Sequence, residues 1–244
     1  MIPIRGSVVG VRPPIVTVLL IALNAAVFFW EVGLHPLVLE TVVRRFGVVP
    51  ARELAALREA PELLEAWLLP IFTSMFLHGG WAHFVGNMLY LWVFGDGVEN
   101  RLGHGRFLLF YVLCGVAASQ AQVWMHPSAT TPMIGASGAI AGVLGAYLAL
   151  YPRASVVLLV PLLFVPFFFE VPAVLFLGIW FFQQLTAGAV MTLSGAAEAG
   201  GVAWWAHVGG FVAGIVLLPL LLDRRHHGYR PLHYRDAARR GLPY

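Results

Sequence analysis

The sequence has 244 residues, of which 59% are hydrophobic and only 11% charged, and its mean hydropathy is +0.81. This number of charged residues is too small to cover a water-exposed surface. The composition therefore excludes an ordinary soluble domain. The formal net charge is +3, and a basic segment beside anionic lipid explains this excess better than nucleic-acid binding, so no nucleic acid is expected as a partner.

Gaps between charged residues predict the membrane-spanning helices. A charge at the centre of a bilayer costs at least about 2.5 kcal/mol, so charges mark the ends of spans. About 20 apolar residues are needed to cross the hydrocarbon layer. The expected spans are 13–30, one span within 66–95, 107–124, 136–151, 171–190 and 203–222. We therefore predict an all-α membrane protein, a six-transmembrane-helix bundle occupying residues 13–222.

Two segments outside these spans are long enough to have structure of their own. Residues 33–70 form a long loop between the first two spans, and within it 51–67 has the mixed apolar and charged spacing of an interfacial helix. The stretch 154–169 is apolar but short, and Pro161 and Pro166 would interrupt a helix. We expect it to be an interfacial or re-entrant loop.

The distribution of arginine predicts the orientation. Most arginines fall on one side of the six spans: Arg5, Arg12, Arg101, Arg106, Arg153 and six more in the tail. By the positive-inside rule this side is cytoplasmic, so 1–12 is a cytoplasmic N-terminal segment and 223–244 a basic cytoplasmic tail. The loop between the first two spans is then extracytoplasmic, and the plasma membrane is the expected location.

The first span could instead be a secretory signal peptide, because Arg5 and Arg12 precede its apolar run. However, no cleavage signal of small residues follows Trp30. We expect this segment to remain as a membrane helix.

A few polar side chains lie within the expected spans, where they are costly and invite a functional explanation. They are His83, Asn87, Ser137, Gln183, Gln184 and His207. The second, fourth and sixth spans all run inward, so their first residues share one level of the membrane. His83 and Asn87 are four residues apart and face the same way on a helix. Ser137 begins its helix, where free N–H groups favour an anion.

Glycine pairs provide a means of bringing two of these helices together. Gly138 and Gly142 lie four residues apart on the fourth span, and Gly210 and Gly214 on the sixth. Such small faces allow close backbone approach. Close approach would bring the His207 imidazole within ~3 Å of the serine hydroxyl, as a general base requires.

Three motifs together carry a family resemblance. They are His83-Phe-Val-Gly-Asn87, Gly135-Ala-Ser137-Gly138, and Ala206-His207 followed by Gly210-xxx-Gly214. In this order and on these spans they resemble the signature of rhomboid intramembrane serine proteases. The resemblance covers about residues 13–222.

The resemblance implies a Ser-His dyad in which Ser137 attacks the scissile carbonyl and His207 transfers the proton. Asn87 and His83, with the Ser137 backbone N–H, would form the oxyanion hole. The implied partners are single-span membrane protein substrates and the lipid bilayer. The resemblance also matches His78 to a loop-ordering histidine. It gives Glu99 and Arg101 a scaffold role in a turn after the second span.

The chain differs from some family members near the base, with Ala141 at the position of a tyrosine that stacks on the histidine. No carboxylate is expected near His207, so packing and neutral hydrogen bonds must orient it. Gln183 and Gln184 are expected to be interhelical hydrogen-bonders or gate-lining residues. No His-Glu-x-x-His motif is present, so neither a metal nor a cofactor is expected.

Two other functions are compatible with parts of this pattern. A histidine within the membrane could serve a transporter as a proton relay, but the chain lacks paired halves with broken helices. A catalytically inactive rhomboid-like protein would bind membrane clients without cleaving them. Such a protein need not keep both Ser137 and His207, so we favour the protease.

Overall fold

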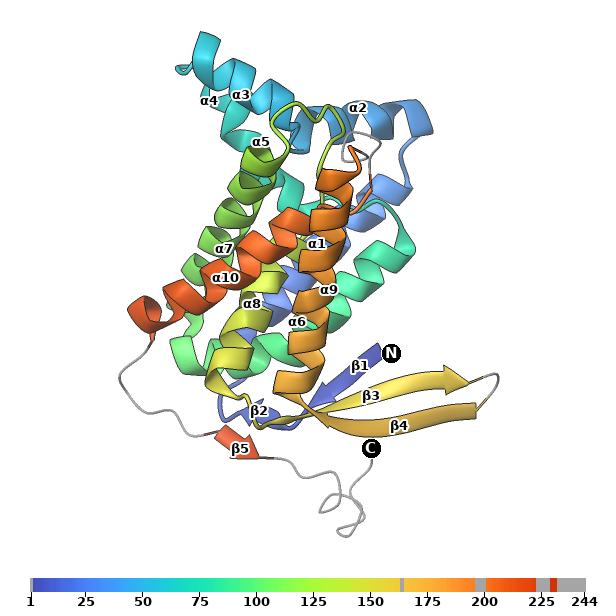
Figure 1. Ribbon diagram of the computed structural model, residues 1–244, viewed down its shortest axis with the longest axis vertical. Coiled ribbons are helices and arrows are strands. Elements are labelled where there is room, and N and C mark those ends of the chain that lie inside the picture. Colours follow the sequence, from blue (N-terminus) through green and yellow to red (C-terminus); the bar gives the residue numbers. More distant parts are fainter. Residues whose placement is uncertain (1, 163–164, 196–200, 223–228, 232–244) are drawn as a thin grey trace.

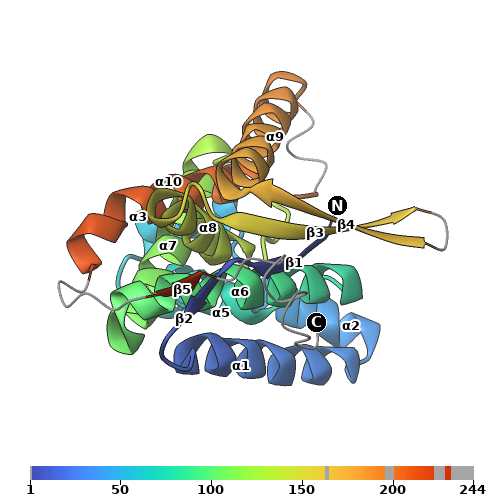
Figure 2. The same cartoon turned by 90° about the horizontal axis from the view of Figure 1, so that it is seen from below.

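The computed structural model describes residues 2–162, 165–195, 201–222 and 229–231 (Figure 1). Apart from 229–231, the predicted basic tail lies outside the described residues. The long helices are α1 (Ile15–Val32), α6 (Trp81–Leu102), α7 (His104–Met125), α8 (Ser137–Leu150), α9 (Ala173–Leu193) and α10 (Trp204–Leu221). Figure 2 shows α1 and α9 on opposite sides of the bundle, with the other long helices between them.

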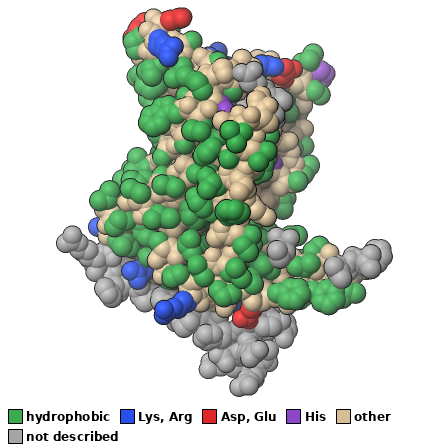
Figure 3. Space-filling model, viewed as in Figure 1, with side chains coloured by type: hydrophobic (Ala, Val, Ile, Leu, Met, Phe, Trp, Pro, Cys, Tyr) green, Lys and Arg blue, Asp and Glu red, His purple; other side chains and the backbone are tan. Residues whose placement is uncertain are grey.

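Four of these helices, α1, α7, α9 and α10, are long and apolar enough to cross a membrane. The helix α8 has only 14 residues, most of them buried among its neighbours. The helix α6 has 22 residues but ends in a charged segment. Figure 3 shows hydrophobic side chains over the middle of the molecule and charged ones mainly at its two ends. The chain is therefore a multi-pass membrane protein built mostly of helices.

The segment between α1 and α6 is folded into short helices. They are α2 (Pro36–Phe46), α3 (Pro50–Glu59), α4 (Leu64–Trp67), α5 (Leu69–Thr73) and the 3₁₀ helix η1 (Ser74–Phe76). The single interfacial helix predicted at 51–67 is thus two helices. The break falls at Pro61, whose ring and missing N–H prevent α3 from continuing.

The prediction of an interfacial or re-entrant loop at 154–169 was wrong. Strands β3 (Ser155–Leu162) and β4 (Val165–Pro172) form an antiparallel hairpin in which Pro161 lies opposite Pro166. The β-branched and aromatic residues of this stretch favour extended backbone, and pairing satisfies its backbone polar groups. The hairpin projects sideways from the base of α9 (Figure 1).

The N-terminal segment is also structured. Strand β1 (Ile2–Gly6) pairs with β3, so that the order of the three-stranded sheet is β1-β3-β4. Strand β2 (Val8–Gly10) pairs with β5 (Tyr229–Pro231). The N-terminal segment predicted at 1–12 therefore closes the end of the bundle opposite to α2 and α3 (Figure 1).

The helix α6 continues past Asp96 to Leu102, so Glu99 and Arg101 lie within it and not in a turn after it. The Glu99 carboxylate accepts the backbone N–H groups of Val16 and Thr17, each at 2.8 Å, and the Thr17 hydroxyl at 2.6 Å. These N–H groups belong to the first turn of α1, where backbone N–H groups have no acceptor within the helix itself. Because its charge is satisfied in this way, Glu99 can be buried at the end of α6.

The helices α8 and α10 are in backbone contact along their glycine faces. A Cβ at Gly210 would overlap the carbonyl oxygen of Gly138, and a Cβ at Gly214 would overlap that of Gly142. This contact fixes the first turn of α10 beside the first turn of α8. Both turns carry candidate site residues.

Candidate active site

Ser137 is the first residue of α8 and directly follows a tight turn. Gly135 has φ +121°, a conformation that side chains disfavour, and its N–H donates to the Ser74 carbonyl oxygen at 2.8 Å. Ala136, the residue at the helix cap, makes no side-chain capping bond. The N–H groups at the start of α8 lack the intrahelical acceptors that later residues have, so they are available to an acceptor that approaches the serine.

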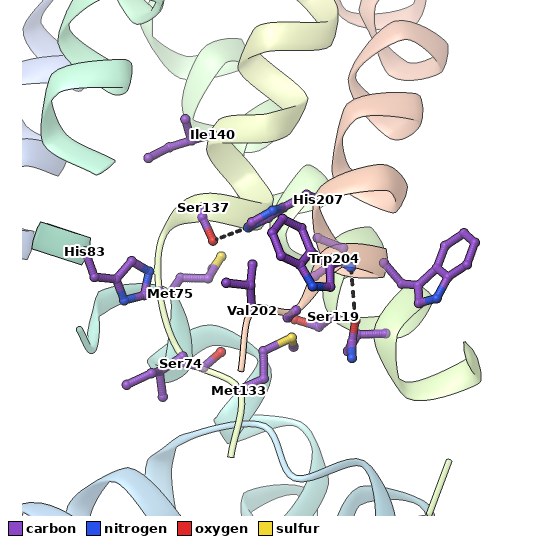
Figure 4. A pocket seen from close by; sticks show the side chains of 18 of the residues that line it. Ser74, Met75, His83, Ser119, Met133, Ser137, Ile140, Val202, Trp204 and His207 are labelled. Carbon is purple, nitrogen blue, oxygen red and sulfur yellow. Dashed lines mark hydrogen bonds between the residues drawn. The ribbon is translucent and has the colours of Figure 1, made fainter. Parts of the chain in front are cut away.

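His207 lies in the first turn of α10 and faces Ser137. Its Nε2 is 2.8 Å from the Ser137 Oγ, although 70 positions separate the two residues (Figure 4). Its other ring nitrogen, Nδ1, is 2.7 Å from Oε1 of Gln184 in α9. An amide oxygen can only accept, so Nδ1 carries the proton and Nε2 is free to accept the serine hydroxyl proton.

Two tryptophans enclose the histidine ring. Trp180 of α9 lies 5.9 Å from it, centroid to centroid, at an interplanar angle of 34°. Trp204 approaches at 6.3 Å and 87°, edge to face. At position 141 the chain has a fully buried alanine. The two tryptophans therefore pack on the imidazole, while position 141, where some family members have a stacking tyrosine, has only a methyl group.

His83 and Asn87 lie on one face of α6 and line the same cavity as Ser137 and His207. The Nδ1 of His83 accepts the Gly79 N–H at 3.3 Å, which leaves the ring proton on Nε2. The His83 ring points into the cavity on the serine side (Figure 4). The Asn87 Nδ2 is buried and has no hydrogen-bond partner among the described residues. Two side chains that bear N–H donors thus line the cavity beside the serine.

The cavity has a volume of about 600 Å³. Its wall combines the polar groups above with apolar side chains such as Met75, Met133 and Trp204 (Figure 4). Within the described part of the chain, no group of three or more metal-ligating side chains is found.

The loop that leads into α6 is held by a residue whose role the sequence analysis missed. Glu31, in the last turn of α1, is buried and accepts the His78 backbone N–H at 3.1 Å. His78 in turn lies 5.2 Å from the His83 ring. The available signal was an acidic residue directly after an apolar run.

This arrangement is that of a multi-pass helical membrane protein with a serine-histidine pair in a cavity between its helices. The comparison with known proteins agrees with it: the model of the Rhomboid domain matches residues 65–224. The chain belongs to the rhomboid family.

Three relatives illustrate the similarity. Rhomboid protease GluP of Bacillus subtilis is 41% identical over 143 residues, which are 57% of this chain and 26% of the relative. Rhomboid protein 1, mitochondrial, of Saccharomyces cerevisiae is 32% identical over 153 residues, 61% of this chain and 40% of the relative. Presenilin-associated rhomboid-like protein, mitochondrial, of Mus musculus is 30% identical over 207 residues, 80% of this chain and 46% of the relative. The matched region thus spans less than half of each of these relatives.

Proposed function

We propose that this protein is an intramembrane serine endopeptidase in which Ser137 and His207 form the catalytic dyad. The observation that carries the proposal is the 2.8 Å approach of His207 Nε2 to Ser137 Oγ, with the imidazole proton on the opposite nitrogen. A serine hydroxyl is a weak nucleophile until an adjacent base accepts its proton. The pair has this geometry within a cavity large enough to admit a peptide segment.

The proposed reaction begins when Ser137 Oγ attacks the scissile carbonyl carbon while its proton passes to His207 Nε2. The carbonyl oxygen becomes negative and accepts hydrogen bonds from Asn87, His83 and the Ser137 backbone N–H. His207 then gives its proton to the leaving amine as the C–N bond breaks. A water molecule, activated by the same histidine, hydrolyses the acyl-enzyme and restores the serine.

We further propose that all six long helices cross the membrane, so that residues 13–222 form one membrane domain. The short length of α8 and the charged end of α6 fit this arrangement, because neighbouring helices cover much of the surface of both. The strand-bearing end, which has more of the described arginines, is then cytoplasmic, and we propose that both termini lie on that side of the membrane. The segment from α2 to η1 is extracytoplasmic, and the plasma membrane is the proposed location.

The proposed substrates are single-span membrane proteins, cleaved near the outer face of the membrane. The cavity is lined at the ends of α6, α8 and α10 nearest the α2–α5 segment, which supports cleavage at that level. The relative from Bacillus subtilis carries the name of a protease. The alternative, a client-binding protein without activity, is the other outcome of the following experiment.

The test combines covalent labelling with cleavage assays in detergent or proteoliposomes. Wild type should react with a fluorophosphonate probe and cleave members of a panel of single-span proteins, whereas Ser137→Ala and His207→Ala should do neither. The matched control is Ser194→Ala at the exposed end of α9, which should behave as wild type. Each variant should retain the wild-type thermal unfolding midpoint. A folded wild type that neither labels nor cleaves would contradict the protease proposal and favour the client-binding alternative.

A further inference from the structure

The His207 ring has a second polar contact, on the side away from the serine. Gln184 lies in the middle of α9, is 6% exposed, and has its Oε1 2.7 Å from His207 Nδ1. Ser137, His207 and Gln184 therefore form a continuous line of hydrogen bonds that joins three helices. A carboxylate holds the equivalent ring nitrogen in a full serine-protease triad.

The contact bears on the protonation state of the base. A neutral imidazole carries one proton, which can sit on either nitrogen. If it sat on Nε2, the ring could not accept the serine proton, and the dyad would be inactive. An acceptor at Nδ1 holds the proton on that side and also fixes the rotation of the ring.

An amide suits this location better than a carboxylate. A buried carboxylate is costly in a desolvated site unless a positive charge accompanies it. The amide oxygen supplies the acceptor without that cost. It also offers a partial negative charge to the imidazolium that forms during the reaction.

The composition of α9 indicates that Gln184 is not there for packing alone. The buried residues of this helix are Ala173, Leu177, Gln184 and Gly188, which follow helical spacing along one face. Gln184 is the one polar side chain among them, and an apolar residue would fill the same space. Its neighbour Gln183 is exposed on the same helix.

We infer that Gln184 is a positioning residue for the base: it holds His207 in the Nδ1–H tautomer, with Nε2 directed at Ser137. The inference rests on the proposed protease function and adds a third residue, from a third helix, to the dyad. In this arrangement a neutral amide orients the histidine ring, as a carboxylate does in a triad.

The first experiment compares Gln184→Met, which keeps the length of the side chain without the acceptor, with Gln184→Glu, which keeps an acceptor. The Met variant should lose roughly 10- to 100-fold in kcat, with KM little changed. This loss is smaller than the roughly 100- to 10,000-fold contribution of a general base, because His207 itself remains. The rate of fluorophosphonate labelling should fall in parallel. Leu185→Met, at an exposed position of the same helix, is the control and should leave both rates unchanged.

The pH profile separates positioning from packing. Wild-type activity should fall in acid as His207 becomes protonated and can no longer act as a base. Gln184→Glu should retain most of the activity at its optimum, and the acid side of its profile should move up by roughly one pH unit, because a carboxylate favours the imidazolium. Equal losses in the Met and Glu variants, or full activity in the Met variant, would overturn the proposal.

An activity-independent measurement keeps this inference distinct from the protease proposal. In protein labelled with ¹⁵N-histidine, the nitrogen chemical shifts of His207, assigned by comparison with His207→Ala, should report an Nδ1–H tautomer. In Gln184→Met this preference should be lost. An unchanged tautomer in that variant would refute the role of Gln184 even if the wild type is an active protease. An inactive wild type with the expected tautomers would refute only the protease.

Discussion

Gly214 of α10 lies directly against the carbonyl group of Gly142 in α8. A Cβ at position 214 would overlap three backbone atoms of Gly142, none of which can move without shifting the helix. The same face of α10 carries His207 two turns earlier. The separation of these helices therefore sets the distance between the candidate nucleophile and its base.

Gly214→Ala should destabilise the protein by roughly 1 to 3 kcal/mol, the usual cost of overpacking, and should also lower the rate of Ser137 labelling. The measurement is thermal unfolding in detergent, combined with labelling by the fluorophosphonate probe. Gly178→Ala is the control, since a Cβ there meets nothing within 4 Å. An equal unfolding midpoint in both variants would show that α8 and α10 do not depend on this contact.

Glu99→Gln should lower the thermal unfolding midpoint. Glu99 is buried and accepts two backbone N–H groups and a hydroxyl from the start of α1, and His104 Nδ1 lies 2.6 Å from it. Glutamine has one acceptor oxygen, so at least one buried donor loses its partner, at a cost of roughly 1.5 to 3 kcal/mol. The exposed Glu62→Gln is the control. Equal midpoints would mean that α1 does not need this cap.

Glu53 should make stability depend on pH. Burial raises the pKa of this carboxyl to about 7, against the opposing effect of Arg52. Because its folded-state pKa lies above the ordinary value, its contribution to stability is fully present below about 4.5 and is lost as pH rises through 7. Glu53→Gln should therefore match wild type near pH 4 and unfold at a higher temperature near pH 8, whereas Glu62→Gln should show no such change. A constant difference between wild type and Glu53→Gln at both pH values would contradict this assignment.

Asn87→Ala should lower kcat by roughly 10- to 1,000-fold, the scale for loss of one oxyanion donor. The Nδ2 of Asn87 is buried and has no partner in the described part of the chain, so a developing oxyanion would be its acceptor. Steady-state cleavage of one substrate gives kcat and KM separately. A larger change in KM than in kcat would instead indicate a role in substrate binding.

Much of the helical framework was predictable because charges are excluded from apolar segments. The expected span 136–151 corresponds to α8 at Ser137–Leu150, and 203–222 corresponds to α10 at Trp204–Leu221. The end of α6 was not predictable by this rule. The rule treats a charge as a boundary, whereas Glu99 is buried because a distant helix start supplies its hydrogen bonds.

The hairpin formed by β3 and β4 shows a second limit of prediction from the sequence. Its prolines correctly indicated that the segment is not a helix, but a short apolar run does not reveal which strand it pairs with. Here β3 pairs with both β4 and β1, and β1 lies some 150 positions earlier in the chain. Pairing between such distant segments leaves no local pattern.

By itself the sequence determined which segments are apolar, and that a hydroxyl, an imidazole and an amide stand near the ends of three of them. Those properties are local, since they depend on residue type and helical spacing. Only the tertiary structure decided that Ser137 and His207 lie within hydrogen-bonding distance, that Gln184 holds the far side of the ring, and that Glu31 anchors the loop before α6. The physical reason is that each of these contacts joins segments that are distant in the sequence, and its length depends on how closely the helices pack.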